Sequence, residues 1–200
     1  MVVSRLVLLL ERWLEKLLLK LQLVRSPSHR LQIYQLQLMK SKVYVETSIP
    51  SFYYEVRTDP DMVARREWTK EWWSKARDRY LLTTSVAVLD ELNRGNFPGK
   101  NEAVNLISNL FFLPIETEIA EIVNFYIQQH LMPSDPVGDA LHLALASYHK
   151  CDFLLTWNCR HLANANKFGH ICRLNVMLGL YVPTMVTPLE LIGAESDEEG

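Results

Sequence analysis

The sequence is poor in glycine and cysteine, and both shortages exclude kinds of site. Only seven of the 200 residues are glycine, and no Gly-rich nucleotide-binding motif occurs. The three cysteines, Cys151, Cys159 and Cys172, form no CxxC pair. An odd number of cysteines without such spacing argues against a disulfide framework or a zinc site and predicts a reducing, cytoplasmic location. For Cys159, an incidental thiol is a commoner role than a nucleophile.

A strong net charge is also missing. The chain carries −2 at pH 7, which divides into +4 for residues 1–38 (six Lys/Arg, two Glu) and −6 for residues 39–200 (fifteen Lys/Arg, twenty-one Asp/Glu). No broad basic face is indicated, so nucleic-acid binding would have to be local and helped by metal. Hydrophobic residues make up 48% and charged residues 22%, which is typical of a globular domain.

Residues 1–38 form a predicted N-terminal extension and linker. Residues 5–24 have the periodicity of an amphipathic helix. Charged residues interrupt this segment, so its longest uncharged stretch is far shorter than the roughly 20 apolar residues of a transmembrane helix. A signal peptide fits poorly as well. Three interpretations stay open: the helix packs on the domain or a partner, it lies on a membrane surface, or it is translated sequence upstream of a natural start at Met39. We predict a domain over residues 39–192 and an acidic tail over 193–200.

Strand-like and helix-like stretches alternate along the domain. Short apolar runs predict strands at 42–45, 81–84, 112–115, 153–156 and from 185. Helical spacing predicts helices at 61–79, 86–93, 101–111, 117–130 and 135–149. This alternation predicts an α/β domain with a central parallel sheet, in which ligands bind beyond the carboxyl ends of the strands.

Three acids and one amide fall at strand ends or on the helices that follow them. Glu46 comes directly after the first strand, Glu91 lies on the helix after the second, Asp139 opens a long helix, and Asn158 follows the fourth strand. Each position also has an ordinary explanation, such as a solvated loop acid or a partner of the helix dipole. We expect Glu91 to point into the crevice and Asp90 to face solvent.

Close carboxylates repel one another, which raises their proton affinity unless a cation neutralises them. Mg²⁺ and Mn²⁺ are hard ions that prefer such oxygen ligands and can activate water beside a phosphodiester. The pattern therefore predicts a Mg²⁺ or Mn²⁺ site made by Glu46, Glu91 and Asp139.

Four segments together resemble PIN-domain ribonucleases, specifically the VapC-type toxin-like family: VYVETSIPSFYYE, REWTKEWWSKARDRYLLTTSVAVLDELNRG, DALHLALA and CDFLLTWNCRHLANA. The resemblance covers most of residues 39–192 and implies a three-layer α/β/α sandwich, Mg²⁺- or Mn²⁺-dependent cleavage of RNA, homodimers and a small antitoxin partner. It implies catalytic roles for Glu46, Glu91, Asp139 and Asn158. Glu46 and Asn158 depart from the commoner Asp at their positions, which leaves the number of metals open.

Candidate substrate contacts surround these positions. They are Thr47, Ser48, Thr156, Arg160 and His161. The segment from Arg57 to Arg79 interleaves basic residues with tryptophans and could clamp RNA, with Trp73 as the candidate for stacking or an interface; core packing is the alternative. His142, one helical turn after Asp139, either approaches the crevice or simply packs.

The function that we expect is a metal-dependent endoribonuclease, the toxin of a type II toxin–antitoxin pair. The alternative is a catalytically weakened PIN-like module that binds RNA or protein, which Asn158 motivates. A DNA nuclease is a third interpretation. No transmembrane segment is expected.

Overall fold

The computed structural model of the protein describes residues 40–192, and Ser41 to Ile192 belong to one compact unit. The predictions for the 1–38 extension and the 193–200 tail lie outside the described residues. Five parallel strands form one sheet in the order β3-β2-β1-β4-β5. The strands are β1 (Lys42–Val45), β2 (Leu81–Ser85), β3 (Phe111–Leu113), β4 (Phe153–Leu155) and β5 (Thr184–Val186).

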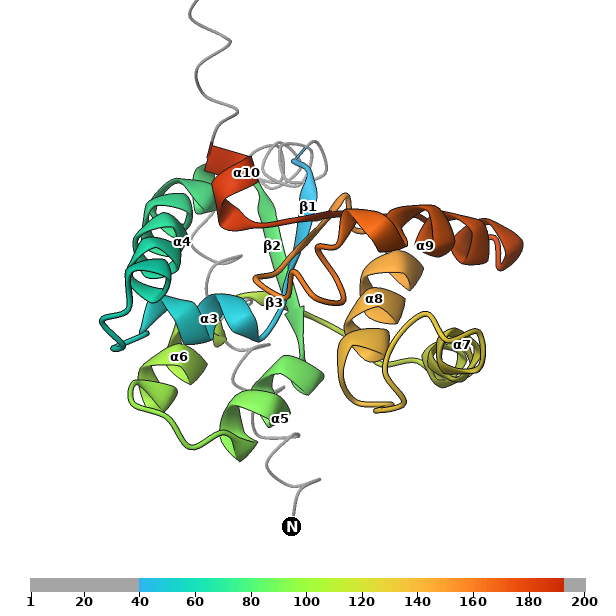
Figure 1. Ribbon diagram of the computed structural model, residues 1–200, viewed down its shortest axis with the longest axis horizontal. Helices are drawn as coiled ribbons and strands as arrows, with labels where there is room; N and C mark the ends of the chain where they lie inside the picture. Colours follow the sequence, from blue (N-terminus) through green and yellow to red (C-terminus); the bar gives the residue numbers. More distant parts are fainter. Residues whose placement is uncertain (1–39, 193–200) are drawn as a thin grey trace, which may run out of the picture. The chain divides into compact units, whose positions relative to one another are not determined.

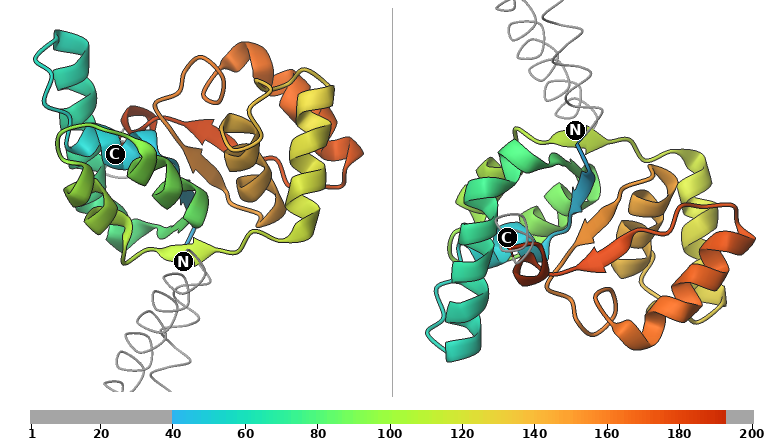
Figure 2. Two further views of the ribbon diagram at one scale, coloured as in Figure 1. Left: turned by 90° about the horizontal axis from the view of Figure 1, so that it is seen from below. Right: turned by 90° about the horizontal axis from the view of Figure 1, so that it is seen from above.

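Helices cover both faces of this sheet (Figure 1). One layer holds α3 (Ser48–Tyr53), α4 (Pro60–Arg79), α5 (Val86–Arg94), α6 (Lys100–Ile107) and α10 (Pro188–Ile192). The other holds α7 (Thr117–Gln128), α8 (Asp139–Tyr148) and α9 (Ala165–Met177). Figure 2 shows the same separation from two further sides, with the blue-to-green helices apart from the yellow-to-orange ones. Right-handed crossovers produce this division, because the chain runs outward from β1 to β3 and then returns to β4 on the other side. The predicted α/β/α sandwich is confirmed.

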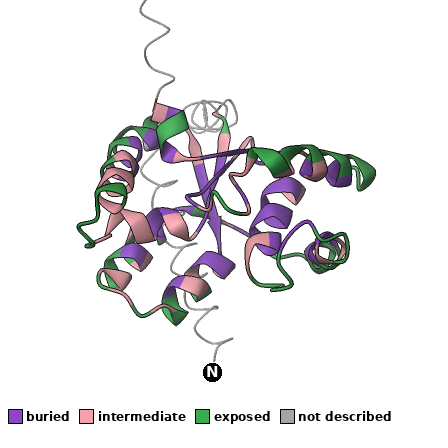
Figure 3. Cartoon of the chain, in the orientation of Figure 1, coloured by how far each residue is buried: buried purple, intermediate pink, exposed green. Residues whose placement is uncertain are grey.

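The core lies on both sides of the sheet, and burial concentrates on the strands and on α8 (Figure 3). Helix α8 is buried at every position from Ala140 to Ser147, which explains why its sequence is apolar around its circumference. Within the sheet, the Thr83 and Thr84 hydroxyls donate to the carbonyls of Val43 and Val45, at 3.0 and 3.1 Å. These bonds satisfy polar atoms that the sheet buries completely.

Helix α4 differs from its prediction in which tryptophans it buries. Trp72 is 2% and Trp73 6% exposed, and Trp73 packs edge-on against Tyr53. The prediction of Trp73 as a stacking or interface residue is therefore wrong, and the core alternative holds for it. The reason is that α3, α10 and β2 all contact α4, so its buried face is wider than a single helical stripe. Among residues 40–192, no helix has both the length and the apolar character needed to cross a membrane.

Several boundaries also differ from the sequence predictions. Helices α3, α9 and α10 were not predicted, and α6 ends at Ile107 because the chain enters β3, where Phe111 pairs with Thr83. Helix α8 begins at Asp139 and not at residue 135. The Asp135 carboxylate accepts a hydrogen bond from the Val137 amide at 3.0 Å, and this local turn competes with helix in residues 135–138.

Candidate metal centre

The candidate site lies at the carboxyl ends of the neighbouring strands β1 and β4, where the chain changes the direction in which it adds strands to the sheet. Strands β1 and β4 are neighbours in the sheet, but the chain leaves β1 toward β2 and leaves β4 toward β5. Helices therefore depart to opposite faces at this point, and the carboxyl ends of β1 and β4 border a crevice. Glu46 follows β1, and Thr156 and Asn158 follow β4.

Glu46 is buried at 6% exposure, and one of its oxygens is fully engaged. Its Oε2 accepts hydrogen bonds from the Ser48 amide (3.0 Å), the Ser48 hydroxyl and the Thr156 hydroxyl (2.8 Å). Its Oε1 accepts none from any residue between 40 and 192. Burial raises the pKa of Glu46, while the charge of His142 and the Ser48 and Thr156 hydrogen bonds oppose that rise.

Glu91 reaches the same place from α5. Its Oε2 accepts hydrogen bonds from the Thr47 hydroxyl and from His142 Nε2, the latter at 3.1 Å. Burial alone would raise its pKa, but the His142 hydrogen bond and charge, with the Thr47 bond, outweigh burial and leave the pKa of Glu91 below its ordinary value. Asp90, its neighbour in sequence, is exposed. Glu91 thus points inward and Asp90 outward, as the sequence predicts.

Asp139 and Asn158 form a hydrogen-bonded pair near His142 and Glu91. The Asn158 Nδ2 donates to Asp139 Oδ1 at 2.7 Å. The amide oxygen of Asn158 accepts from the backbone amides of Arg160 (3.2 Å) and His161 (3.1 Å). Burial raises the pKa of Asp139, against the lowering effects of the charges on His161 and His142. Asn158 therefore orients Asp139, because its oxygen is committed to the loop backbone.

His142 joins the site, and the sequence had left its role open. Its Nδ1 lies 2.9 Å from the Tyr44 hydroxyl, which lies 2.7 Å from the Ser85 hydroxyl. Ser85 precedes α5, and its side chain makes no cap hydrogen bond to that helix. A chain of polar contacts thus connects Glu91 through His142 and Tyr44 to β2.

Three potential metal ligands of the described residues form a compact group that differs from the predicted set. One ligand atom each from Glu46, Glu91 and His142 lie within 4.8 Å of one another, while Asp139 is not part of this group. The predicted set was Glu46, Glu91 and Asp139, and the structure adds His142 to the first two of these residues. Burial alone would lower the pKa of His142, but the Glu91 hydrogen bond and the charges of the nearby acids raise it. The spacing of three residues between Asp139 and His142, which puts both on one helix face, was the signal for His142 in the sequence.

The candidate substrate contacts divide into two groups. Thr47, Ser48 and Thr156 each bond directly to a site carboxylate. The side chain of His161 lies 3.4 Å from Lys167 Nζ, and Arg160 is exposed. The hydroxyl residues thus orient the acids, whereas the side chains of Arg160 and His161 donate to no site carboxylate in the described structure.

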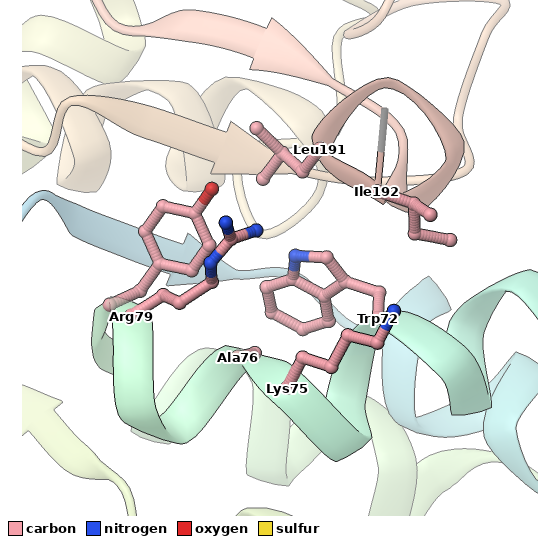
Figure 4. A pocket seen from close by; sticks show the side chains of 7 residues that line it. Trp72, Lys75, Ala76, Arg79, Leu191 and Ile192 are labelled. Carbon is pink, nitrogen blue, oxygen red and sulfur yellow. The ribbon is translucent and has the colours of Figure 1, made fainter. Parts of the chain in front are cut away.

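A separate small cavity lies between α4 and α10 (Figure 4). Its volume is about 10 Å³, and its lining includes Trp72, Tyr80 and Leu191. Trp72 Nε1 is the one buried side-chain polar atom of residues 40–192 without a hydrogen-bond partner, and a cavity of this size accommodates about one water molecule. Since Tyr80 directly precedes β2, the cavity lies toward the amino ends of the strands and shares no residue with the carboxylate cluster.

Comparison of the chain with protein-family models, with curated proteins and with solved structures gives no match.

Proposed function

We propose that the protein uses a divalent cation, Mg²⁺ or Mn²⁺, to hydrolyse phosphodiester bonds in RNA, as the toxin of a toxin–antitoxin pair. One observation carries the catalytic part. Three partly or fully buried carboxylates, Glu46, Glu91 and Asp139, all lie close enough to His142 to interact with its charge, and each uses one oxygen for hydrogen bonds while the other accepts none from the described residues. Such an arrangement of acids favours a bound cation, because their negative charges otherwise oppose one another.

The second oxygen of each acid is accessible. Trp72 Nε1 is the only atom among the buried side-chain nitrogens and oxygens of residues 40–192 that lacks a partner. Glu46 Oε1, Glu91 Oε1 and Asp139 Oδ2 are therefore not sealed from solvent. Carboxylate oxygens are the ligands that Mg²⁺ and Mn²⁺ prefer, so the donor set fits the ion.

Neighbouring side chains orient the carboxylates that would hold the cation. Hydrogen bonds from Ser48 and Thr156 direct Glu46, and Asn158 directs Asp139. A divalent cation bound there would lower the pKa of a coordinated water and offset charge on the phosphodiester. Residues 39–200 carry a net charge of −6 by sequence count, and such a surface needs this local positive charge to approach a polyanion.

The identity of the substrate and the biological role have a different basis. RNA as substrate, a homodimer, a cognate antitoxin and a cytoplasmic location come from the resemblance of the four sequence segments to VapC-type PIN domains. The acid cluster supports metal-dependent hydrolysis, but it gives no information about the substrate, the partners or the location. They are proposed together because one family combines them.

Cleavage of a structured RNA by the purified chain in Mn²⁺ tests the catalytic part. We expect Glu91→Gln and Asp139→Asn to reduce the cleavage rate about 100-fold or more, since each removes a charge from the cation site. Asp90→Asn is the matched control for Glu91→Gln, because it removes the adjacent but exposed acid of α5, and it should cleave as the unaltered protein does. Equal rates for all these variants would refute the proposal.

The same assay addresses the alternative role. Asn158 stands where an acid is commoner in the resembling family, and its amide bonds Asp139. Stable, metal-independent binding of RNA without any cleavage would favour a PIN-like binding module over a nuclease. Cleavage of single-stranded DNA in preference to RNA would overturn the substrate class but not the metal chemistry.

A further inference from the structure

We propose that His142 is a direct nitrogen ligand of the cation and that it makes the site prefer first-row transition ions, such as Mn²⁺ and Co²⁺, over Mg²⁺. The inference rests on the proposed function for the presence of a cation, and it is independent of what the site cleaves. It replaces the all-oxygen site that the sequence predicts with a mixed nitrogen and oxygen site.

The geometry around His142 supports coordination. Its Nε2 lies 3.1 Å from Glu91 Oε2, and the ligand atoms of Glu46, Glu91 and His142 lie within 4.8 Å of one another. Two ligands at a right angle around a cation, with bonds of roughly 2.1 Å, are about 3 Å apart. The imidazole and Glu91 already have that separation, and Glu46 is close enough to complete the group with a small side-chain adjustment.

The partner of the other ring nitrogen also fits a metal-bound histidine. To bind a cation, Nε2 must carry a lone pair, so the proton of the neutral ring must be on Nδ1. That nitrogen would then donate to the Tyr44 hydroxyl 2.9 Å away, and the Tyr44 proton would point to Ser85 at 2.7 Å. A hydroxyl both donates and accepts, so the contact supports this tautomer. Metal-bound histidines generally have such a partner, which fixes the ring.

A simple ion pair with Glu91 accounts for only part of this arrangement. His142 is 1% exposed on a helix whose residues from Ala140 to Ser147 are all buried, and one buried imidazole needs one carboxylate for neutralisation. Two carboxylates face it, and each keeps an oxygen that accepts no hydrogen bond from residues 40–192. Coordination of a shared cation uses all three side chains.

A nitrogen ligand changes the ranking of metals. Mg²⁺ prefers oxygen ligands and retains its waters, whereas imidazole binds first-row transition ions, with affinity rising from Mn²⁺ to Co²⁺. A site with His142 should therefore bind in the order Mg²⁺, Mn²⁺, Co²⁺, from weakest to tightest. An all-oxygen site would discriminate less.

The test uses the full chain stripped of metal with a chelator. Calorimetric titration with Mg²⁺, Mn²⁺ and Co²⁺ gives the three dissociation constants, and pulsed electron paramagnetic resonance of the Mn²⁺ complex detects nitrogen coupling to the ion. In the unaltered chain we expect nitrogen coupling and the order given above. In His142→Gln the coupling should vanish and the preference for Mn²⁺ over Mg²⁺ should fall roughly ten-fold or more.

The control is His149→Gln. His149 caps the other end of the same helix, and its Nε2 lies 2.8 Å from the Pro114 carbonyl oxygen, so this variant should keep both the coupling and the metal order. If His142→Gln does not fold, the resonance spectrum of the unaltered chain still decides. Absence of nitrogen coupling, or of Mn²⁺ binding, would overturn the inference. Nitrogen coupling without RNA cleavage would support it and reject the nuclease instead.

Discussion

Tyr44→Phe removes one buried hydroxyl without changing the shape of the core. The ring is fully buried, and its hydroxyl contacts Ser85 at 2.7 Å and His142 at 2.9 Å. Leaving two buried polar groups without a partner costs about 1–3 kcal/mol each, so we expect a loss of about 2–6 kcal/mol with no cavity contribution. For a domain of this size that corresponds to a fall in Tm of roughly 4–24 °C, measurable by thermal and urea denaturation of the metal-free chain.

The same substitution should weaken metal binding. Without the Tyr44 hydroxyl, nothing described fixes the proton on His142 Nδ1, and loss of such an outer partner lowers metal affinity by about 10–100-fold. Tyr126→Phe is the matched control, because Tyr126 is also fully buried and donates to Asn175 at 2.5 Å away from the acids. It should lose stability but bind Mn²⁺ normally. Unchanged Mn²⁺ affinity in Tyr44→Phe, or an equal loss in Tyr126→Phe, would refute the reasoning.

Two further predictions concern stability alone. The pKa values of His142 and Glu46 are raised, so their stabilising contribution is complete below the unfolded values of about 6.5 and 4.3 and is lost as pH rises through the folded values. The free energy of unfolding of the metal-free chain should therefore fall as pH rises above these unfolded values. Mn²⁺ should counteract the fall, and a flat profile would contradict this account. Gly99 has φ +79°, and an added Cβ would lie 2.7 Å from Tyr54 Cβ, whereas Gly169 on α9 has open space. Gly99→Ala should therefore destabilise by about 1–3 kcal/mol and Gly169→Ala should stabilise by about 0.5–1 kcal/mol in urea denaturation, and the opposite order would show that backbone conformation does not control these sites.

The sheet was predictable because its strands are short apolar runs that alternate with helical stretches. Each predicted strand overlaps an observed one, as with 81–84 and β2 (Leu81–Ser85). Helix α9 was missed because Gly169 and several polar residues weaken its helical pattern, and its buried face shows only Ile171, Leu174 and Asn175. Its N-cap, Asn164, which accepts from the Asn166 amide, was the local signal that could have located it.

The positions of Glu46 and Asn158 were predictable from a rule about sheets, whereas the partners of the site residues were not. The strand-end rule directs attention to Glu46 and Asn158 from sequence position alone. The contact between Tyr44 and His142 joins residues 98 positions apart, and it depends on α8 packing over β1 on the face to which Tyr44 points. Periodicity describes each element by itself and contains no information about which face of α8 meets which strand.

Helix α8 carries both Asp139 and His142, and its residues from Ala140 to Ser147 are all buried. Two candidate metal ligands on one buried helix cannot move independently, because any shift of the helix moves both side chains together. Substitutions at small buried positions such as Ala144 would therefore change the distance of both side chains from Glu46 and Glu91. The tuning of ion choice in this protein is accordingly open to changes in packing that leave every donor side chain in place.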